Sequence, residues 1–329
     1  MRVGMNPHKK YKKSKMTYHH RLIIVVFIPS QDGYYKNIFD VLKLCLKSAI
    51  TTKNEKCGIT VVNNASCKDV EDYLNDIFSK NCIDSLVHHK TNLGKIDALI
   101  GAARGCREPL ITLSDIDILF KKGWQEAIEE IFSKIKNVGS VSPISSNRYA
   151  KYCTVSSIQK ILLKKVNFSF EPIPENFIDH NRNLSCTNWK LDKHENVKWP
   201  VVKKNKTKAI LGSPHQILTI RRELLFTNIP FFPSYTLIGG NSEYTFCDLP
   251  IDMSGSLRLA TYRNFAYHMG NKLENWMLDV QKENKLKLKE KNNAELKLPD
   301  FKPKSLTFFQ YNLKKRFFIS VYEIFIAKN

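Results

Sequence analysis

Three short aliphatic runs, each followed by a polar cluster, constrain the fold more than any other feature of this sequence. The runs are Leu22–Ile28, Ile59–Val62 and Pro109–Leu113. Segments in which apolar residues recur at helical spacing separate them, at residues 36–50 and 95–105. Alternation of buried strands with helices is typical of a mostly parallel sheet that helices cover on both faces. We therefore predict an α/β fold.

The polar clusters predict where function is located. They lie at residues 29–32, 63–66 and 114–117, directly after the three runs. In open sheets of parallel strands, ligands bind outside the carboxyl ends of the strands. This holds for any doubly wound nucleotide-binding fold, so the clusters locate a site without naming its ligand.

The second half of the chain is less regular. We expect strands within residues 139–145 and 208–220. Residues 165–207 contain prolines, asparagines and lysines and are interpreted as a long loop, which either covers the acceptor side of a site or is an ordinary insertion.

The charge of the chain favours anionic partners. Lys and Arg number 52 against 31 Asp and Glu, which gives a formal net charge of +21. Nucleic acid, anionic lipid and phosphate-bearing substrates all suit such a charge. The sequence has no zinc-finger, RNP-type or helix-turn-helix signature, so we expect no nucleic-acid partner. A basic nucleic-acid-binding protein stays an alternative, which salt-sensitive binding to DNA or RNA would favour.

The cysteines and the first residues indicate a cytoplasmic protein. The eight cysteines form no CxxC pair, and free thiols suit a reducing compartment. The first twenty residues are basic and polar, without the apolar segment of a signal peptide. The run at 22–28 is too short to cross a bilayer.

Asp115 and Asp117 are the centre of the functional prediction. Two carboxylates one residue apart in an extended strand point the same way. At a strand end they can hold Mn²⁺ or Mg²⁺ through oxygen ligands, and such a cation stabilises a diphosphate leaving group. Pairs of this kind are also common in solvated turns or helix caps. The neighbouring motifs are therefore needed to distinguish a metal site from these alternatives.

Five motifs in order resemble family 2 glycosyltransferases of the GT-A fold, over roughly residues 20–275. They are Pro29-Ser30, Asn63-Asn64-Ala65-Ser66, Asn92-Leu93-Gly94-Lys95, the pair Asp115 and Asp117, and Gly123-Trp124. The resemblance implies the GT-A fold, which has a mostly parallel central sheet flanked by helices. A C-terminal helical tail follows it here.

The resemblance also implies a nucleotide-sugar donor. Pro29 and Ser30 would line the nucleotide pocket, and Lys95 would lie near the donor phosphates or base. Asn63 stands where the family usually has an acidic residue, so uridine is only the default base. The donor-binding residues implied are Pro29, Ser30, Asn63, Asn64, Lys95, Ser114 and Asp115.

The segment from Gly239 to Tyr244 resembles the acidic acceptor-side segment of the family. A carboxylate there acts as the general base on the acceptor hydroxyl, which it must reach while ionised. Glu243 is the candidate, and Asp248 and Asp252 are alternatives because the usual Glu-Asp pair is missing. A structural carboxylate that caps a helix is the competing interpretation.

Two histidines enter the site prediction. His268 resembles the late histidine that some GT-A enzymes add as a metal ligand, which imidazole can be for Mn²⁺. The implied metal ligands are thus Asp115, Asp117 and His268, with Mn²⁺ or Mg²⁺ as cofactor. His215 is a candidate for the acceptor pocket, although a lone histidine is more often structural.

The ends of the chain differ from the centre. Residues 1–18 are expected to form a flexible basic arm and residues 276–329 a basic amphipathic tail. The tail repeats Phe and Leu at helical spacing among basic residues, which suits an anionic membrane interface as well as a helix docked on the body. The catalytic domain is expected at 19–275, with a nucleotide-sugar half at 19–120 and an acceptor half at 121–275.

The prediction is therefore a divalent-metal-dependent, inverting glycosyltransferase. It would move a hexosyl or N-acetylhexosaminyl group from a nucleotide-diphosphate sugar, UDP-sugar by default, to a saccharide or lipid-linked acceptor. Surface polysaccharide assembly on the inner face of the membrane is the default setting. A sugar nucleotidyltransferase is disfavoured because no Gly-rich basic loop follows the first strand. A GT-A-like protein that has lost catalysis is the remaining alternative.

Overall fold

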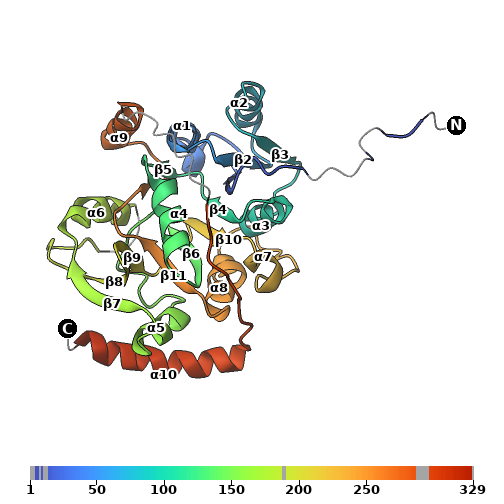
Figure 1. The fold of residues 1–329 in the computed structure, drawn as a ribbon. Helices are drawn as coiled ribbons and strands as arrows, with labels where there is room; N and C mark the ends of the chain where they lie inside the picture. The colour runs from blue at the N-terminus through green and yellow to red at the C-terminus, as the bar shows by residue number, and fades with distance from the viewer. Residues whose placement is uncertain (1–3, 7–8, 10–13, 187–189, 287–295, 328–329) are drawn as a thin grey trace.

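A large sheet with helices on both faces forms the body of the protein (Figure 1). The computed structural model describes residues 4–6, 9, 14–186, 190–286 and 296–327. Within these residues, ten strands form one sheet in the order β3-β2-β1-β4-β10-β6-β11-β9-β8-β7. The strands are β1 (His20–Val26), β2 (Cys57–Asn64), β3 (Ser85–His89), β4 (Leu110–Ser114), β6 (Val138–Ser142), β7 (Asn167–Pro172), β8 (Lys198–Lys204), β9 (Thr207–Leu211), β10 (Ile217–Arg221) and β11 (Leu257–Thr261).

The strand directions confirm the predicted α/β fold. β1 pairs in parallel with β2 and β4, and β2 pairs in parallel with β3. β10 lies antiparallel between β4 and β6, and β11 continues in parallel with β6. The aliphatic runs of the sequence therefore lie side by side, and the polar residues after them meet at one edge of the sheet.

Helices cover both faces because the central strands are apolar on both sides. Leu22 and Ile24 of β1 pack in a core shared with α1, α2 and α4, whereas Ile23 and Val25 pack with α3 and α7. Alternate side chains of a strand point to opposite faces, so a continuous aliphatic run fits this position. The helices are α1 (Ile38–Thr52), α2 (Lys68–Ser79), α3 (Lys95–Gly105), α4 (Trp124–Lys134), α5 (Val155–Leu162), α6 (Phe177–Ser185), α7 (Leu224–Thr227), α8 (Leu249–Met253), α9 (Asn275–Leu286) and α10 (Phe308–Ala327).

A small second sheet lies beside the large one. Its strands are β5 (Ile118–Phe120) and β12 (Ala266–His268), which pair antiparallel. The register places His268 opposite Ile118, directly after Asp117 in sequence. This pairing joins the segment after Asp117 to a segment about 150 residues further along the chain.

The prediction of a long loop at 165–207 is wrong. This segment contains β7, α6 and β8, which complete one edge of the sheet. β7 pairs only with β8, so its polar residues suit an edge position. Pro200 lies within β8 opposite Phe170, and pairing with β9 begins one residue later at Val201. A proline is tolerated where no ladder hydrogen bond is needed from its nitrogen.

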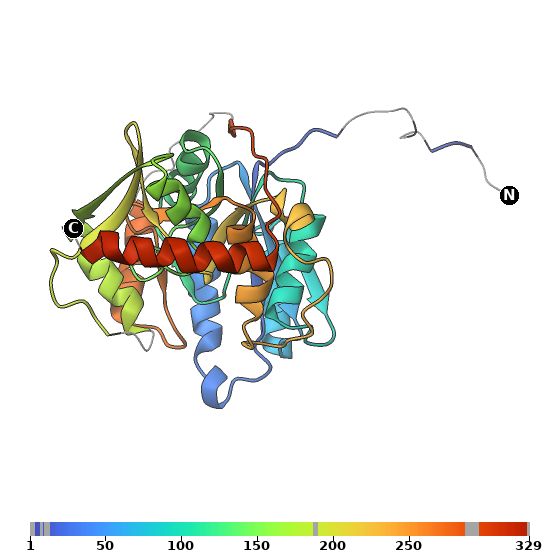
Figure 2. The same cartoon turned by 90° about the horizontal axis from the view of Figure 1, so that it is seen from below.

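The C-terminal helix α10 docks on the body of the protein. Figure 2 shows α10 running across the molecule over α5, and the two helices are in contact. Tyr311 and Tyr322 are buried on its inner face. No helix among the described residues is long and apolar enough to span a membrane. Most lysines of the predicted N-terminal arm, at positions 10, 12 and 13, lie outside the described residues, as do residues 287–295 of the predicted tail.

Candidate active site

Asp117 and His268 meet beside the carboxyl end of β4. β4 ends at Ser114, and the amide of Asp115 then donates to the carbonyl of Gln216 at 2.9 Å. The β5–β12 pairing brings His268 Nε2 to 3.1 Å from Asp117 Oδ2. Burial alone would lower the pKa of His268, but the hydrogen bond to Asp117 outweighs it and raises the pKa to about 10.

Lys95 joins two further carboxylates at the same place. Its Nζ lies 2.7 Å from Asp115 Oδ1 and 3.1 Å from Glu243 Oε1. Burial opposes the charged ammonium, yet the two carboxylates together raise the pKa of Lys95 above its usual value. Burial likewise opposes ionisation of Glu243, but Lys95 reverses this and holds the pKa of Glu243 below its usual range. Glu243 is therefore ionised at neutral pH.

The residues present fit a divalent cation in part. Within the described part of the chain, no group of three or more His, Cys, Asp or Glu side chains is arranged to hold a metal ion. Asp115 contacts Lys95, which leaves Asp117 and His268 as the adjacent pair. Asp117 Oδ1 is buried and has no hydrogen-bond partner, as expected of an oxygen that accepts a cation. Mg²⁺ and similar ions are often held by one or two protein ligands and completed by substrate phosphates.

Asn63 and Asn64, which are predicted donor residues, are buried at the end of β2. Both side chains are nearly inaccessible, with exposed fractions of 2% and 1%. Asn63 Oδ1 accepts from the amide of Ser66 at 3.0 Å, and its Nδ2 contacts His88 Nδ1. Asn64 Nδ2 donates to Asn92 Oδ1 at 2.7 Å. These hydrogen bonds fix the loops that follow β2 and β3.

The other predicted donor residues differ in accessibility. Pro29 is exposed and Ser30 half-buried in the loop after β1. Ser114 is buried, and its hydroxyl donates to the carbonyl of Asp115 at 2.9 Å. Pro29 and Ser30 can therefore line a pocket, whereas Ser114 supports the backbone before the aspartates.

The structure separates the three candidate bases. Glu243 keeps 15% of its side chain exposed beside Lys95. Asp248 and Asp252 are fully buried. Asp252 accepts from the amides at residues 155 and 156, both at 2.8 Å, and from Tyr311 at 2.9 Å. A base must reach the hydroxyl it deprotonates, which leaves Glu243 as the candidate.

A buried ionic network positions His215 at the site. The sequence alone made His215 only a weak candidate. Asp248 Oδ1 accepts from Arg258 at 2.6 Å, and Oδ2 contacts His215 Nδ1 and the Tyr152 hydroxyl, both at 3.0 Å. Burial alone would raise the pKa of Asp248, but Arg258 and His215 hold it below its usual value. His215 precedes Gln216, whose carbonyl accepts from Asp115. In the sequence, His215 is marked only by its place in the Gly-Ser-Pro-His-Gln turn before β10. Its partner Asp248 lies far from it along the chain.

The loop at 234–240 is anchored to the start of α3. Asp97 accepts hydrogen bonds from the amides of Ser234 and Tyr235, at 2.7 and 3.0 Å. The amide of Lys95 donates to Leu237 O at 3.0 Å. Gly94 fits beneath the loop with a φ of +92°, and an added Cβ would lie 2.1 Å from Thr236 O.

We expect Gly94→Ala to displace this loop and lower both stability and activity. The backbone contact and the positive φ together should cost about 2 kcal/mol or more. Gly101→Ala, on the same helix with open space at its Cβ, is the matched control and should be neutral or slightly stabilising. Thermal unfolding and the rate of nucleotide release are the measurements. Equal behaviour of the two variants would refute the tight fit at Gly94.

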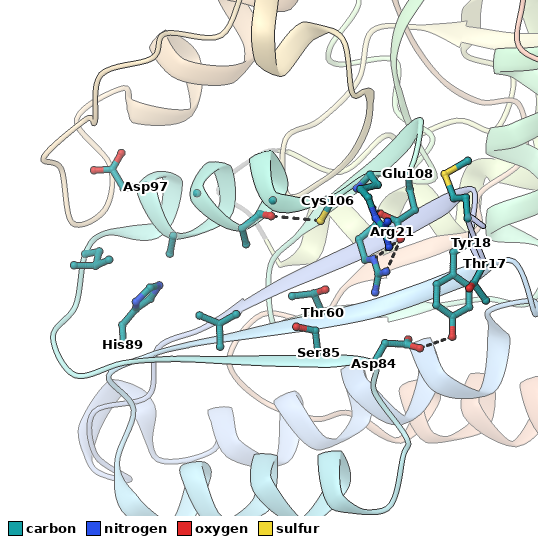
Figure 3. Close-up of a pocket in the computed structure, with 18 residues that line it drawn as sticks. Thr17, Tyr18, Arg21, Thr60, Asp84, Ser85, His89, Asp97, Cys106 and Glu108 are labelled. Carbon is teal, nitrogen blue, oxygen red and sulfur yellow. Dashed lines mark hydrogen bonds and ion pairs between the residues drawn. The ribbon is translucent and has the colours of Figure 1, made fainter. Parts of the chain in front are cut away.

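A cavity of about 780 Å³ lies elsewhere, between α3 and the face of β1, β2 and β3 (Figure 3). Four of its polar side chains are paired with one another: Arg21 Nε donates to Glu108 at 3.1 Å, and the Tyr18 hydroxyl donates to Asp84 at 2.5 Å. Asp115, Asp117, Lys95, Glu243 and His268 do not line it. The cavity is therefore separate from the cluster at the end of β4.

Comparison with known proteins finds one family model that matches part of the chain. Residues 33–184 match the family model for glycosyl transferase family 2. No curated protein matches the chain.

Similar solved structures include a mannosyltransferase, PcManGT from Pyrobaculum calidifontis in complex with GDP-Man and Mn²⁺, GalNAc-T7 with UDP, GalNAc and Mn²⁺, and the inositol-1-phosphate CTP transferase from T. maritima. Their identities to this chain are 14%, 13% and 12%, with TM-scores of 0.45, 0.46 and 0.40. Each match covers 82% of this chain, and 61%, 48% and 97% of the other. The chain thus spans less than two thirds of the first two. TM-scores this low do not support a comparison of the site with these structures. Residues 33–184 are therefore similar to glycosyl transferase family 2, and the mostly parallel sheet flanked by helices is that of the GT-A fold.

Proposed function

We propose that the protein transfers a sugar from a nucleotide-diphosphate sugar to a hydroxyl group of a saccharide or lipid-linked acceptor. One observation carries the proposal. Side chains from four separate segments converge at the carboxyl end of β4, with Lys95 between Asp115 and Glu243, and Asp117 beside His268. A cationic group, an ionised carboxylate and an unpartnered carboxylate oxygen in one place suit departure of a diphosphate from an activated sugar.

The transfer is proposed as one displacement. Glu243 accepts the proton of the acceptor hydroxyl while the acceptor oxygen bonds to the anomeric carbon. The bond from that carbon to the diphosphate oxygen breaks at the same time. The products are the glycosylated acceptor and the nucleoside diphosphate, and the proton passes from Glu243 to solvent. Attack opposite the leaving group inverts the anomeric configuration.

The charged residues have separate proposed roles. Lys95 keeps Glu243 ionised and places a positive charge close to the departing diphosphate. Asp115 fixes the ammonium of Lys95 and lies on the ribose side of the donor. Asp117 and His268 would hold Mn²⁺ or Mg²⁺, which when bound neutralises charge that develops on the diphosphate.

The finer assignments rest on the family resemblance. We propose a UDP-sugar as default donor and a hexosyl or N-acetylhexosaminyl group as the sugar. Residues 19–120 would form the donor half and 121–275 the acceptor half, with Pro29 and Ser30 at the nucleotide. Polysaccharide assembly at the cytoplasmic face of the membrane is the proposed setting, with no nucleic-acid partner.

A donor panel tests the proposal. UDP-glucose, UDP-N-acetylglucosamine, GDP-mannose and a dTDP-sugar are each incubated with the protein and Mn²⁺, Mg²⁺ or a chelator, and release of nucleoside diphosphate is followed. We expect one nucleotide class to be turned over with metal, and no turnover with chelator. Absence of both binding and turnover for all donors with both metals would overturn the proposal.

A further inference from the structure

A cavity lined by lysines lies beside α10, away from the candidate active site. It has a volume of about 230 Å³ and is bounded by α5, the turn at 254–256 and the segment 301–306. The described residues that line it include no Asp or Glu. Its lysines are Lys160, Lys165, Lys302, Lys304 and Lys314.

The backbone around the cavity is fixed by hydrogen bonds. The amide of Lys304 donates to Ser254 O at 2.7 Å, and the carbonyl of Lys304 accepts from Asn228 at 2.9 Å. Lys160 Nζ donates to the carbonyl of Gly255, and Lys314 Nζ donates to Gln159 at 3.4 Å. The backbone at Lys304 and the ammonium groups of Lys160 and Lys314 are thus held around the cavity.

The surroundings of Lys160 in the cavity disfavour its positive charge. Burial lowers the pKa of Lys160 to about 8; nearby Asp252 opposes this, and the neighbouring lysines lower the pKa further. The carboxylate of Asp252 is fully buried and already accepts hydrogen bonds from two amides and Tyr311. An anion in the cavity would relieve the repulsion among the lysines.

The outer face of α10 carries an apolar stripe next to the cavity. Phe309, Leu313, Phe317 and Ile324 are 78%, 64%, 62% and 59% exposed. At 3.6 residues per turn they lie on one side of the helix, opposite the buried Tyr311 and Tyr322. Lys314 lies on the flank between the two faces, less than one turn from Phe317. Figure 2 shows α10 lying along the outside of the molecule.

We propose that α10 and the lysine cavity form a docking site for an anionic membrane, with the phosphate of a lipid headgroup in the cavity and the apolar stripe in the lipid interface. The occupant has to be both apolar and anionic, because the stripe and the cationic cavity adjoin. A free phosphate would use the lysines and leave the stripe exposed, and an apolar protein surface would leave the lysines without an anion. Basic amphipathic helices bind anionic interfaces by these two contributions. The site extends the proposed membrane location and does not depend on the transfer chemistry.

Vesicle sedimentation tests the proposal with the full chain. Phosphatidylglycerol and phosphatidylcholine vesicles are compared at about 0.1 M salt, near physiological screening. The cavity variant is Lys165→Gln/Lys302→Gln/Lys304→Gln, and its three lysines are exposed. The matched control is Lys36→Gln/Lys47→Gln/Lys90→Gln, which removes the same charge from exposed lysines outside the cavity. The stripe variant is Phe309→Gln/Phe317→Gln.

We expect binding to phosphatidylglycerol vesicles and little binding to phosphatidylcholine. Each basic residue near an anionic surface contributes about fivefold in affinity, so the cavity variant should lose on the order of a hundredfold. The stripe variant should lose at least tenfold, and the control should stay near wild type. Inorganic phosphate at millimolar concentration should not displace the protein. Three results would overturn the proposal: no vesicle binding, equal loss in cavity variant and control, or an unaffected stripe variant. Donor turnover, measured separately without vesicles, should be unchanged in all three variants.

Discussion

Replacing Glu243 by glutamine is expected to slow nucleoside diphosphate release by about a thousandfold while donor affinity changes little. General base catalysis contributes about 10²–10⁴-fold to rate. The amide oxygen of glutamine can still accept the hydrogen bond from Lys95, which lies 3.1 Å from Glu243 Oε1. The substitution therefore removes the basic oxygen and keeps the shape of the site. Turnover with Mn²⁺ and the Kd of the donor are measured on the same preparation.

Ser242→Ala is the control for Glu243→Gln. It removes the hydrogen bond that the Ser242 hydroxyl donates to Glu243 Oε2 at 3.0 Å, but leaves the carboxylate. We expect a loss of less than about tenfold, the scale of one hydrogen bond. If Glu243→Gln and Ser242→Ala lowered turnover equally, Glu243 would be a structural carboxylate.

Replacing Arg258 by methionine is expected to destabilise the fold by about 3–5 kcal/mol. Arg258 and Asp248 are both fully buried, and their nearest charged atoms lie 2.6 Å apart. Removal of the guanidinium leaves the buried Asp248 carboxylate without its closest positive charge, and that loss of compensation is the main cost. For a chain of this size the melting temperature should fall by on the order of 10 °C. Thermal and urea unfolding measure both quantities.

Two further variants identify the cause of that loss. Arg263→Met breaks an exposed pair with Glu175 at 3.9 Å and should cost less than about 1 kcal/mol. The double variant Asp248→Leu/Arg258→Met removes both buried charges and should recover more than half of the loss. No recovery in the double variant would show that packing, and not the unpaired carboxylate, explains the loss.

The sheet was predictable because its central strands are buried on both faces. Such strands appear in the sequence as continuous aliphatic runs, as at Leu22–Ile28, and the polar residues after them meet at one edge of the sheet. The edge strand β7 was missed because an exposed edge needs no continuous apolar run. The sequence therefore predicts strands where burial requires a continuous apolar run.

The site was only partly predictable for a related reason. The family resemblance suggested that His268 joins Asp117, and the β5–β12 register places them together. The burial of Asn63 and Asn64 was not predictable, because an asparagine after a strand can equally face a ligand or close a loop. The Asp248–Arg258 pair depends on remote contacts that leave no local pattern.

Donor binding by Asp117→Asn, measured by calorimetry with and without Mn²⁺, tests most directly whether Asp117 holds the metal ion. Asp117 has a buried oxygen without a hydrogen-bond partner beside His268, and asparagine keeps its size but removes the charge that a cation requires. Asp72→Asn, which changes an exposed carboxylate on α2, is the control. We expect Mn²⁺ to tighten donor binding in the wild type and in Asp72→Asn, and we expect this gain to disappear in Asp117→Asn. Mn²⁺-dependent binding that survives in Asp117→Asn would contradict this expectation.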